Sequence, residues 1–259
     1  MERIARGGPA LVALSGGVDS GLVASLAFEA LGGRAVAATI ASSAVSAAER
    51  DRARTIARRI GIRHVEIRAD PIDRPEYRAN PTDRCYHCRS VETAALAGWG
   101  AAAGIDQYLD GVQRDDLADD RPGLRAMNEA GFLHPLLWAD WGKPDVREVA
   151  RARDLPNWDQ PSDACLASRV AHGDPITPEL LRRIEAAESV VAAYGFRRVR
   201  VRVRGGAARV EVDPGEVVRL TAEPTAAAIV AGVRAVGFDP VTLDPRGYGQ
   251  GASALRVVP

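Results

Sequence analysis

The stretch Pro9-Ala-Leu-Val-Ala-Leu14, followed by Ser15-Gly-Gly-Val-Asp-Ser20, decides how this chain folds. Its first part is a short apolar run, which is typical of a buried parallel strand. A glycine-rich turn comes next, and apolar residues then recur at helical spacing from Gly21 to Leu31, just before Gly32. The stretch therefore predicts a strand, a tight turn and a helix in direct succession.

Strands and helices continue to alternate after this turn. Further strands are predicted at Ala35–Ile40, Arg63–Ile67 and Asp106–Leu109, with helices from Ser46 to Ile60 and from Ser90 to Ala103. Such alternation predicts right-handed crossovers and a parallel α/β sheet of the Rossmann-like kind, which binds ligands beyond the carboxyl ends of its strands. The turn Ser15–Ser20 and the dipeptide Asp110–Gly111 both lie at such ends.

The glycine-rich turn has the chemistry of a phosphate site. Unpaired backbone N–H groups and the positive end of a helix dipole suit a phosphate, and Gly16 and Gly17 let the backbone approach it closely. Ser15 and Ser20 add hydroxyl donors, and Asp19 is a candidate ligand for the Mg²⁺ ion that accompanies a triphosphate. No Gly-Lys-Ser/Thr ending follows, so the turn is not a Walker A loop.

This turn resembles the signature of the PP-loop ATP pyrophosphatases, which cleave ATP to AMP and pyrophosphate and have a HUP-type parallel sheet. ATP and Mg²⁺ are therefore the expected cofactors. The predicted nucleotide-binding residues are Ser15, Gly16, Gly17, Val18, Asp19, Ser20, Asp110 and Gly111.

A second, smaller α+β domain is predicted after a linker-like change between residues 157 and 175, which places the domains at 1–160 and 161–259. Its clearest feature is a hairpin with strict alternation, Arg198–Arg204 and Ala207–Val212, joined by Gly205-Gly206. Folding it about the glycines pairs Arg200 with Glu211 and Arg198 with Asp213, and the valines form a buried face.

Arg202 then faces Arg209 across the predicted hairpin. Two like charges directly opposed are unfavourable unless an anion bridges them. The pair is therefore a candidate phosphate or carboxylate site, and a solvated face is the alternative.

Composition argues against several classes of protein. The 34 basic and 34 acidic residues cancel, so no overall field draws the chain onto nucleic acid. No run approaches the length of a membrane span, and the N-terminus has no secretory pattern, so a cytoplasmic protein is expected. Three cysteines are an odd number, which argues against a disulfide framework and favours metal or catalytic roles.

Several further motifs occur along the chain. They are Arg84-Cys-Tyr-His-Cys-Arg89, Asp110-Gly with Asp115-Asp116, Arg121-Pro-Gly-Leu-Arg125, Trp158-Asp-Gln-Pro161 and Ala164-Cys-Leu-Ala-Ser-Arg169. Together with the arginine hairpin, they resemble the LarE family over nearly the whole chain. This family comprises ATP-dependent sulfur transferases that build the nickel-pincer nucleotide cofactor. The resemblance implies adenylation of a carboxylate on pyridinium-3,5-biscarboxylic acid mononucleotide, followed by sulfur delivery to form a thiocarboxylate.

The source of the sulfur depends on the cysteines. By resemblance, Cys165 is the family's sulfur-handling cysteine, which in sacrificial members becomes dehydroalanine. Cys85 and Cys88 stand in a C-x-x-C spacing that lets two thiolates reach one metal centre. We expect a [4Fe-4S] cluster held by Cys85, Cys88 and Cys165, with one iron open for sulfide. In the alternative, Cys165 alone is sacrificial. Cys85 and Cys88 are then a zinc site, a redox pair or simply near neighbours.

For catalysis and substrate binding, the resemblance points to residues on both sides of the linker. Catalytic roles are expected for Cys165, Asp19 and Glu188, and substrate contacts for Ser168, Arg169, Arg200, Arg202 and, through the hairpin, Arg209. The resemblance also implies a homo-oligomer, a hexamer, with hand-over from an upstream carboxylase and to a downstream nickel-inserting enzyme. A PP-loop enzyme that thiolates tRNA and a nucleotide-binding regulatory protein are the rival interpretations.

Four positions depart from the family pattern. Gln113 stands where Asn is expected, Gln160 where Lys is expected, His134 where Ser is usual and His172 where Tyr is usual. The absence of a lysine at position 160 affects which phosphate or substrate contacts are expected next to the Cys165 loop. It leaves the argument from the glycine-rich turn unchanged.

Overall fold

The computed structural model describes residues 1–117, 121–161 and 163–249. The chain forms two compact units, one made of Met1–Tyr77 and Thr82–Asp163, the other of Arg78–Pro81 and the chain from Ala164 onward. The break after Asp163 is close to the boundary predicted after residue 160. Among the described residues, no helix is both long enough and apolar enough to cross a membrane.

The short segment Arg78–Pro81 belongs with the second unit, which the sequence analysis did not foresee. Asn80 is fully buried there, and its side-chain amide donates to the carbonyl oxygens of Ala171 and Asp174 at 2.8 and 3.0 Å. The N–H of Ile176 donates to the carbonyl oxygen of Arg78 at 2.9 Å. Contacts between residues about ninety positions apart leave no local signal in sequence.

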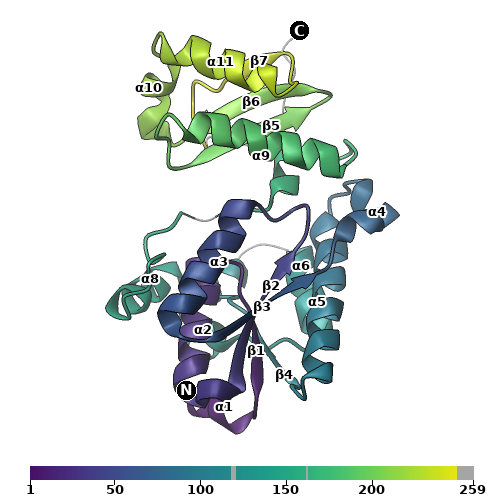
Figure 1. Ribbon diagram of the computed structural model, residues 1–259, viewed down its shortest axis with the longest axis vertical. Helices are drawn as coiled ribbons and strands as arrows, with labels where there is room; N and C mark the ends of the chain where they lie inside the picture. Colours follow the sequence, from purple (N-terminus) through teal and green to yellow (C-terminus); the bar gives the residue numbers. More distant parts are fainter. Residues whose placement is uncertain (118–120, 162, 250–259) are drawn as a thin grey trace. The chain divides into compact units, whose positions relative to one another are not determined.

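The first unit is built on a four-stranded parallel sheet of order β3-β2-β1-β4, which confirms the predicted α/β class (Figure 1). The strands are β1 (Ala10–Ala13), β2 (Ala35–Ala41), β3 (Arg63–Arg68) and β4 (Gln107–Leu109). β1 and β2 are apolar almost throughout because helices cover both faces of the sheet.

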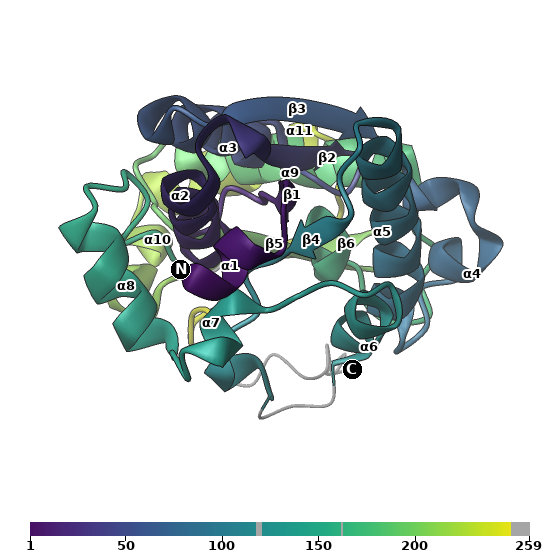
Figure 2. The same cartoon turned by 90° about the horizontal axis from the view of Figure 1, so that it is seen from below.

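The helices cover the two faces in separate groups. They are α1 (Glu2–Arg6), α2 (Val18–Leu31), α3 (Ala47–Ile60), α4 (Pro75–Arg78), α5 (Arg84–Ala102), α6 (Pro122–Glu129), α7 (Pro135–Trp138) and α8 (Lys143–Ala152). Figure 2 shows α2 and α8 on one side of β1 and β4, with α5 and α6 on the other. The two apolar clusters follow the same division, one around Val12, Leu22 and Ile56, the other around Leu11 and Leu96.

The observed starts of two helices can be compared with the predicted ones. Ser46 and Glu49 form the predicted capping box at the start of α3. Helix α5, in contrast, begins at Arg84 rather than at the predicted Ser90. The start was missed because the first turns of α5 are polar and contain two cysteines, so they show no apolar periodicity. Helix α6 packs against these turns, with Gly123 next to Cys85.

The second unit is an α+β structure with a three-stranded sheet of order β5-β6-β7. Its elements are α9 (Pro178–Ala192), β5 (Val199–Arg204), β6 (Ala207–Val212), α10 (Val217–Thr221), α11 (Thr225–Ala235) and β7 (Val241–Leu243). The hairpin register is as predicted, with Arg200 opposite Glu211 and Arg202 opposite Arg209. Strand β7 was missed because three residues are too few to show alternation.

Candidate active site

The glycine-rich turn lies between β1 and the start of α2, at the carboxyl edge of the sheet. The Ser20 hydroxyl accepts from the N–H of Ser15 at 3.1 Å, and the two hydroxyl oxygens are 3.1 Å apart. Gly17 is the N-cap residue that precedes α2, and no side chain caps this helix. Hydrogen bonds between Ser15 and Ser20 thus hold the turn together. The backbone N–H groups at the start of α2 are left for a phosphate.

Two glycines, one in this turn and one after β4, have no room for a side chain. Gly16 has φ +85°, and a Cβ atom on it would lie 2.7 Å from the carbonyl oxygen of Glu49. A Cβ on Gly111 would lie 2.5 Å from the backbone nitrogen of Ser20. The backbone after β4 therefore packs directly on the peptide between Asp19 and Ser20, as expected if both loops form one site.

Asp19 is half-buried beside Lys143, the first residue of α8. The Lys143 Nζ lies 2.5 Å from Asp19 Oδ2, whereas Asp19 Oδ1 is buried and has no hydrogen-bond partner in the described structure. Burial raises the pKa of Asp19, and the Lys143 ammonium opposes this shift. Sequence reasoning missed Lys143 because a lysine in the first turn of a helix has no distinguishing pattern.

Asp110 is held by His134, one of the positions that depart from the family pattern. One carboxylate oxygen, Oδ1, accepts from the N–H of Val112 at 3.0 Å and lies 2.7 Å from His134 Nδ1. The other imidazole nitrogen lies 2.7 Å from Asn128 Oδ1. Asp110 is only 4% exposed, and its second oxygen, Oδ2, has no hydrogen-bond partner among the residues described.

Gln113 organises the acidic loop after β4, although it stands where Asn was expected. Its buried side chain accepts from the N–H of Asp115 at 2.9 Å, and its own N–H donates to Asp116 at 3.0 Å. Asp115 accepts from the N–H of Lys143 at 2.9 Å, and Asp116 pairs with Arg121 at 2.6 Å. The loop thereby connects the carboxylates to the start of α8.

These carboxylates fit a magnesium ion. Asp19, in the first turn of α2, and Asp110, after β4, each have one buried oxygen without a partner, and the two segments touch at Gly111. Mg²⁺ is commonly held by one or two carboxylates, with the remaining positions filled by water and substrate phosphate. In the described parts of the chain, no group of three or more His, Cys, Asp and Glu side chains is arranged to hold a metal. A carboxylate pair that shares the ion with a triphosphate needs no such group.

The cysteines are divided between the two units. Cys85 and Cys88 lie in the first two turns of α5, and Cys88 Sγ is 3.4 Å from the buried carboxylate of Glu92. Cys165 lies in the second unit, immediately before the short 3₁₀ helix Leu166–Arg169. None of these three cysteines is joined in a disulfide bond. A cluster bound by all three therefore stays a prediction.

The Cys165 loop is built around Arg169, whose side chain is 2% exposed. One guanidinium nitrogen, Nη1, contacts the carbonyl oxygens of Ala164 and Cys165 and the hydroxyl of Ser168. The opposite edge forms a bidentate pair with Glu188 on α9, at 2.8 and 3.1 Å. The structure thus brings together four residues that sequence reasoning had placed at the substrate and at the reacting sulfur.

The arginine hairpin differs from expectation in its ion pairs. Arg202 and Arg209 were expected to oppose each other with no carboxylate of the chain between them, but the carboxylate of Glu211 lies 3.2 Å from Arg202 and 2.8 Å from Arg209. Asp244 adds a second carboxylate 3.3 Å from Arg209. The anion that bridges the opposed arginines is therefore supplied by the protein, because a long side chain reaches its diagonal neighbour as easily as the residue opposite.

Arg200 has different surroundings. It is 5% exposed, and its Nη1 donates to the carbonyl oxygen of Val199 at 2.7 Å. Its guanidinium also lies over the ring of Tyr248, 5.4 Å from the centroid, within reach of a cation–π contact. The valines opposite are buried as predicted, and Arg198 pairs with Asp213 at 3.1 Å.

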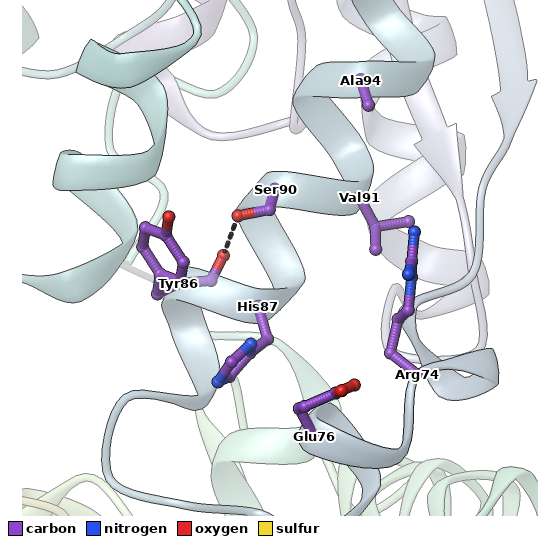
Figure 3. Close-up of a pocket in the computed structure, with 7 residues that line it drawn as sticks. All are labelled: Arg74, Glu76, Tyr86, His87, Ser90, Val91 and Ala94. Atoms are coloured by element: carbon purple, nitrogen blue, oxygen red, sulfur yellow. Dashed lines mark hydrogen bonds between the residues drawn. The ribbon is translucent and has the colours of Figure 1, made fainter.

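A separate hollow of about 410 Å³ lies between the segment around α4 and the start of α5. Figure 3 shows Arg74 reaching toward Val91 on α5, with the carboxylate of Glu76 turned toward the Arg74 side. On α5, the Ser90 hydroxyl donates to the Tyr86 carbonyl oxygen at 2.9 Å. The hollow is lined by Arg74, Glu76, Tyr86, His87, Ser90, Val91 and Ala94. Sequence reasoning assigned these residues no role, and none of the predicted site residues lines it.

A central parallel strand that runs into a serine- and glycine-rich turn, with two acidic side chains beside it, defines the PP-loop class of ATP-binding proteins. The family model of asparagine synthase matches residues 2–87, which include this turn. The chain is 32% identical over 93% of its length to the pyridinium-3,5-bisthiocarboxylic acid mononucleotide synthase of Lactiplantibacillus plantarum, covering 87% of that protein. The chain belongs to the LarE family.

Two other relatives align over much of the chain. An uncharacterized protein of Synechocystis sp. is 39% identical over 93% of this chain and 90% of its own length. An uncharacterized protein of Methanocaldococcus jannaschii is 29% identical over 78% of this chain and 77% of its own. The two relatives that cover 93% of the chain extend the resemblance across both units.

Proposed function

We propose that the chain is an ATP-dependent sulfur transferase that converts the carboxylates of pyridinium-3,5-biscarboxylic acid mononucleotide to thiocarboxylates. The alignment with the Lactiplantibacillus synthase, which spans both units, carries this proposal. The product is a precursor of the nickel-pincer nucleotide cofactor. An anionic nucleotide substrate suits a second unit in which Arg202 contacts the Cys165 loop and Arg200 lies on the same strand.

The first step is adenylation. A substrate carboxylate oxygen attacks the α-phosphorus of ATP, the bond to the β-phosphate oxygen breaks, and pyrophosphate leaves. The backbone N–H groups at the start of α2 would bind the departing phosphates. Asp19 and Asp110 would hold Mg²⁺ through their unpartnered oxygens, and Lys143, which pairs with Asp19, would supply a positive charge beside the bound phosphates.

The second step is sulfur delivery. A sulfur nucleophile attacks the acyl carbon and AMP leaves, because adenylation has converted a poor leaving group into a good one. We propose that Cys85, Cys88 and Cys165 together hold a [4Fe-4S] cluster, which would supply the sulfur when bound. The alternative is that Cys165 gives up its own sulfur once. The C-x-x-C pair on α5 favours the cluster, because consecutive turns of a helix present both thiols to one partner.

One experiment separates these mechanisms. The protein is purified without oxygen, its iron is measured, and its intact mass is recorded before and after reaction with ATP and the pyridinium substrate. Repeated turnover with added sulfide and an unchanged mass supports the cluster, and Cys85→Ala should then be inactive. A loss of hydrogen sulfide at Cys165 supports sacrifice. Full activity of Cys85→Ala would exclude the cluster.

A second measurement tests the function itself. Pyrophosphate release should depend on the pyridinium substrate, and Asp19→Asn should abolish it. Cys165→Ser should retain pyrophosphate release and lose thiocarboxylate formation. If release requires no substrate, or if tRNA replaces the substrate, the assignment is wrong. The homo-oligomer and the hand-over to neighbouring enzymes are further parts of the proposal, to be tested by sedimentation and by coupled assays.

A further inference from the structure

We infer that the buried pair of Arg169 and Glu188 is a positioning device that holds the Cys165 loop, and that neither side chain contacts the substrate. The inference rests on the proposed role of Cys165 in sulfur transfer. It differs from the expectation drawn from sequence, in which Arg169 binds substrate and Glu188 acts in catalysis.

One nitrogen of the Arg169 guanidinium faces the loop that carries the cysteine. Its Nη1 faces acceptors on Ala164, Cys165 and Ser168, so a single nitrogen ties together the residues on both sides of the thiol. Those acceptors lie 3.0 Å away for Cys165 and 3.1 Å for Ser168. A planar guanidinium is suited to this task because its donors have a fixed geometry.

Glu188 fixes the other edge of that guanidinium. Both carboxylate oxygens accept from Arg169, and Oε1 also accepts from the N–H of Val201 at 3.0 Å. The carboxylate therefore links the loop to both α9 and β5. Side-chain exposures of 2% for Arg169 and 16% for Glu188 leave little surface for a ligand.

A neighbouring arginine secures the end of the same loop. The Nη1 of Arg202 donates to the carbonyl oxygen of Ser168 at 2.8 Å, and its Nε donates to Glu211 at 3.2 Å. The loop is thus held from two directions by arginines that are themselves held by glutamates. Such support of a reactive group by buried hydrogen bonds is what keeps its geometry fixed during reaction.

The test compares the reactivity of the thiol with the affinity for substrate. In the full-length reduced protein, Glu188→Gln and the double variant Arg169→Met/Glu188→Met are treated with iodoacetamide, and the alkylation rate of each cysteine is followed by mass spectrometry. The double variant removes both charges together, so that no unpaired charge is left buried to unfold the unit. Circular dichroism verifies folding, and Cys85, in the other unit, is the internal control.

Release of the loop should raise the alkylation rate of Cys165 about tenfold, with Cys85 unchanged. The maximal rate of thiocarboxylate formation should fall, while the dissociation constant of the pyridinium mononucleotide stays within about twofold of wild type. An unchanged Cys165 rate in both variants overturns the inference, as does a large loss of affinity without a change in that rate. If Cys165→Ser retains sulfur transfer, the proposed role of Cys165 fails, but the alkylation result still decides whether the pair holds the loop.

Discussion

Replacing Glu211 tests most directly whether a buried carboxylate stabilises the arginine hairpin of the second unit. It is 2% exposed in its side chain and lies between Arg202 and Arg209, which face each other across the hairpin. The change Glu211→Gln keeps the shape of the side chain and removes its charge. The two half-buried arginines would then repel each other. One carboxylate, that of Asp244, would remain 3.3 Å from Arg209.

The expected cost follows from this geometry. Removing one partner of a buried ion pair costs about 3–5 kcal/mol, because the other charge stays buried without compensation. Asp244 retains part of the neutralisation at Arg209, and both arginines keep some solvent contact, at 19% and 16% exposure. We therefore expect a loss at the lower end, about 3 kcal/mol of local unfolding free energy.

Hydrogen exchange followed by mass spectrometry measures this loss of local unfolding free energy in the hairpin itself. Because about 1.4 kcal/mol corresponds to a factor of ten, amides of β5 and β6 should exchange about a hundredfold faster in Glu211→Gln. Sulfate should slow the exchange again by bridging the two arginines. The matched control is Glu216→Gln, which breaks a more exposed pair with Arg219 in the same unit and should cost less than about 1 kcal/mol. If the two variants behave alike, the bridging carboxylate does not hold the hairpin.

Three further predictions concern the first unit. Gly16→Ala should abolish substrate-dependent pyrophosphate release, because a Cβ at φ +85° meets backbone at 2.7 Å, whereas Gly33→Ala, where the added Cβ would meet nothing within 4 Å, should retain it. His134→Ala should raise the Mg²⁺ concentration for half-maximal release about tenfold by freeing Asp110, and His134→Asn should restore it; no change in either would refute the contact's role. Burial lowers the pKa of His64 below 6.5, so the unfolded chain takes up this proton at higher pH than the folded chain. Stability in urea should therefore fall as pH drops through 6.5, and His64→Gln should flatten that decline; an equal decline in the variant would contradict this.

Much of the first unit could be predicted because its signals are local. The apolar run before Ser15, the capping box at Ser46 and the glycine that ends α3 each depend on a few adjacent residues. The register of the hairpin was equally accessible, because the Gly205-Gly206 turn and strict alternation allow a single pairing.

The candidate site was only partly accessible for the opposite reason. Lys143 lies more than a hundred residues from Asp19, and His134 reaches Asp110 only because the backbone at Leu133 pairs beside β4. Contacts of this kind leave no periodic trace, and a lysine or histidine that makes them looks like any surface residue in sequence.

By itself, the sequence determined the parallel α/β fold, the phosphate-binding turn and the alternation of the hairpin, since these follow from backbone chemistry and periodicity over a few residues. Only the tertiary structure decided which charges meet. It placed Glu211 between two arginines, turned Arg169 and Glu188 toward the Cys165 loop, and left one oxygen of Asp19 and one of Asp110 without protein partners. Long side chains choose their partners by distance in space and by burial, and neither quantity is written in the order of the residues.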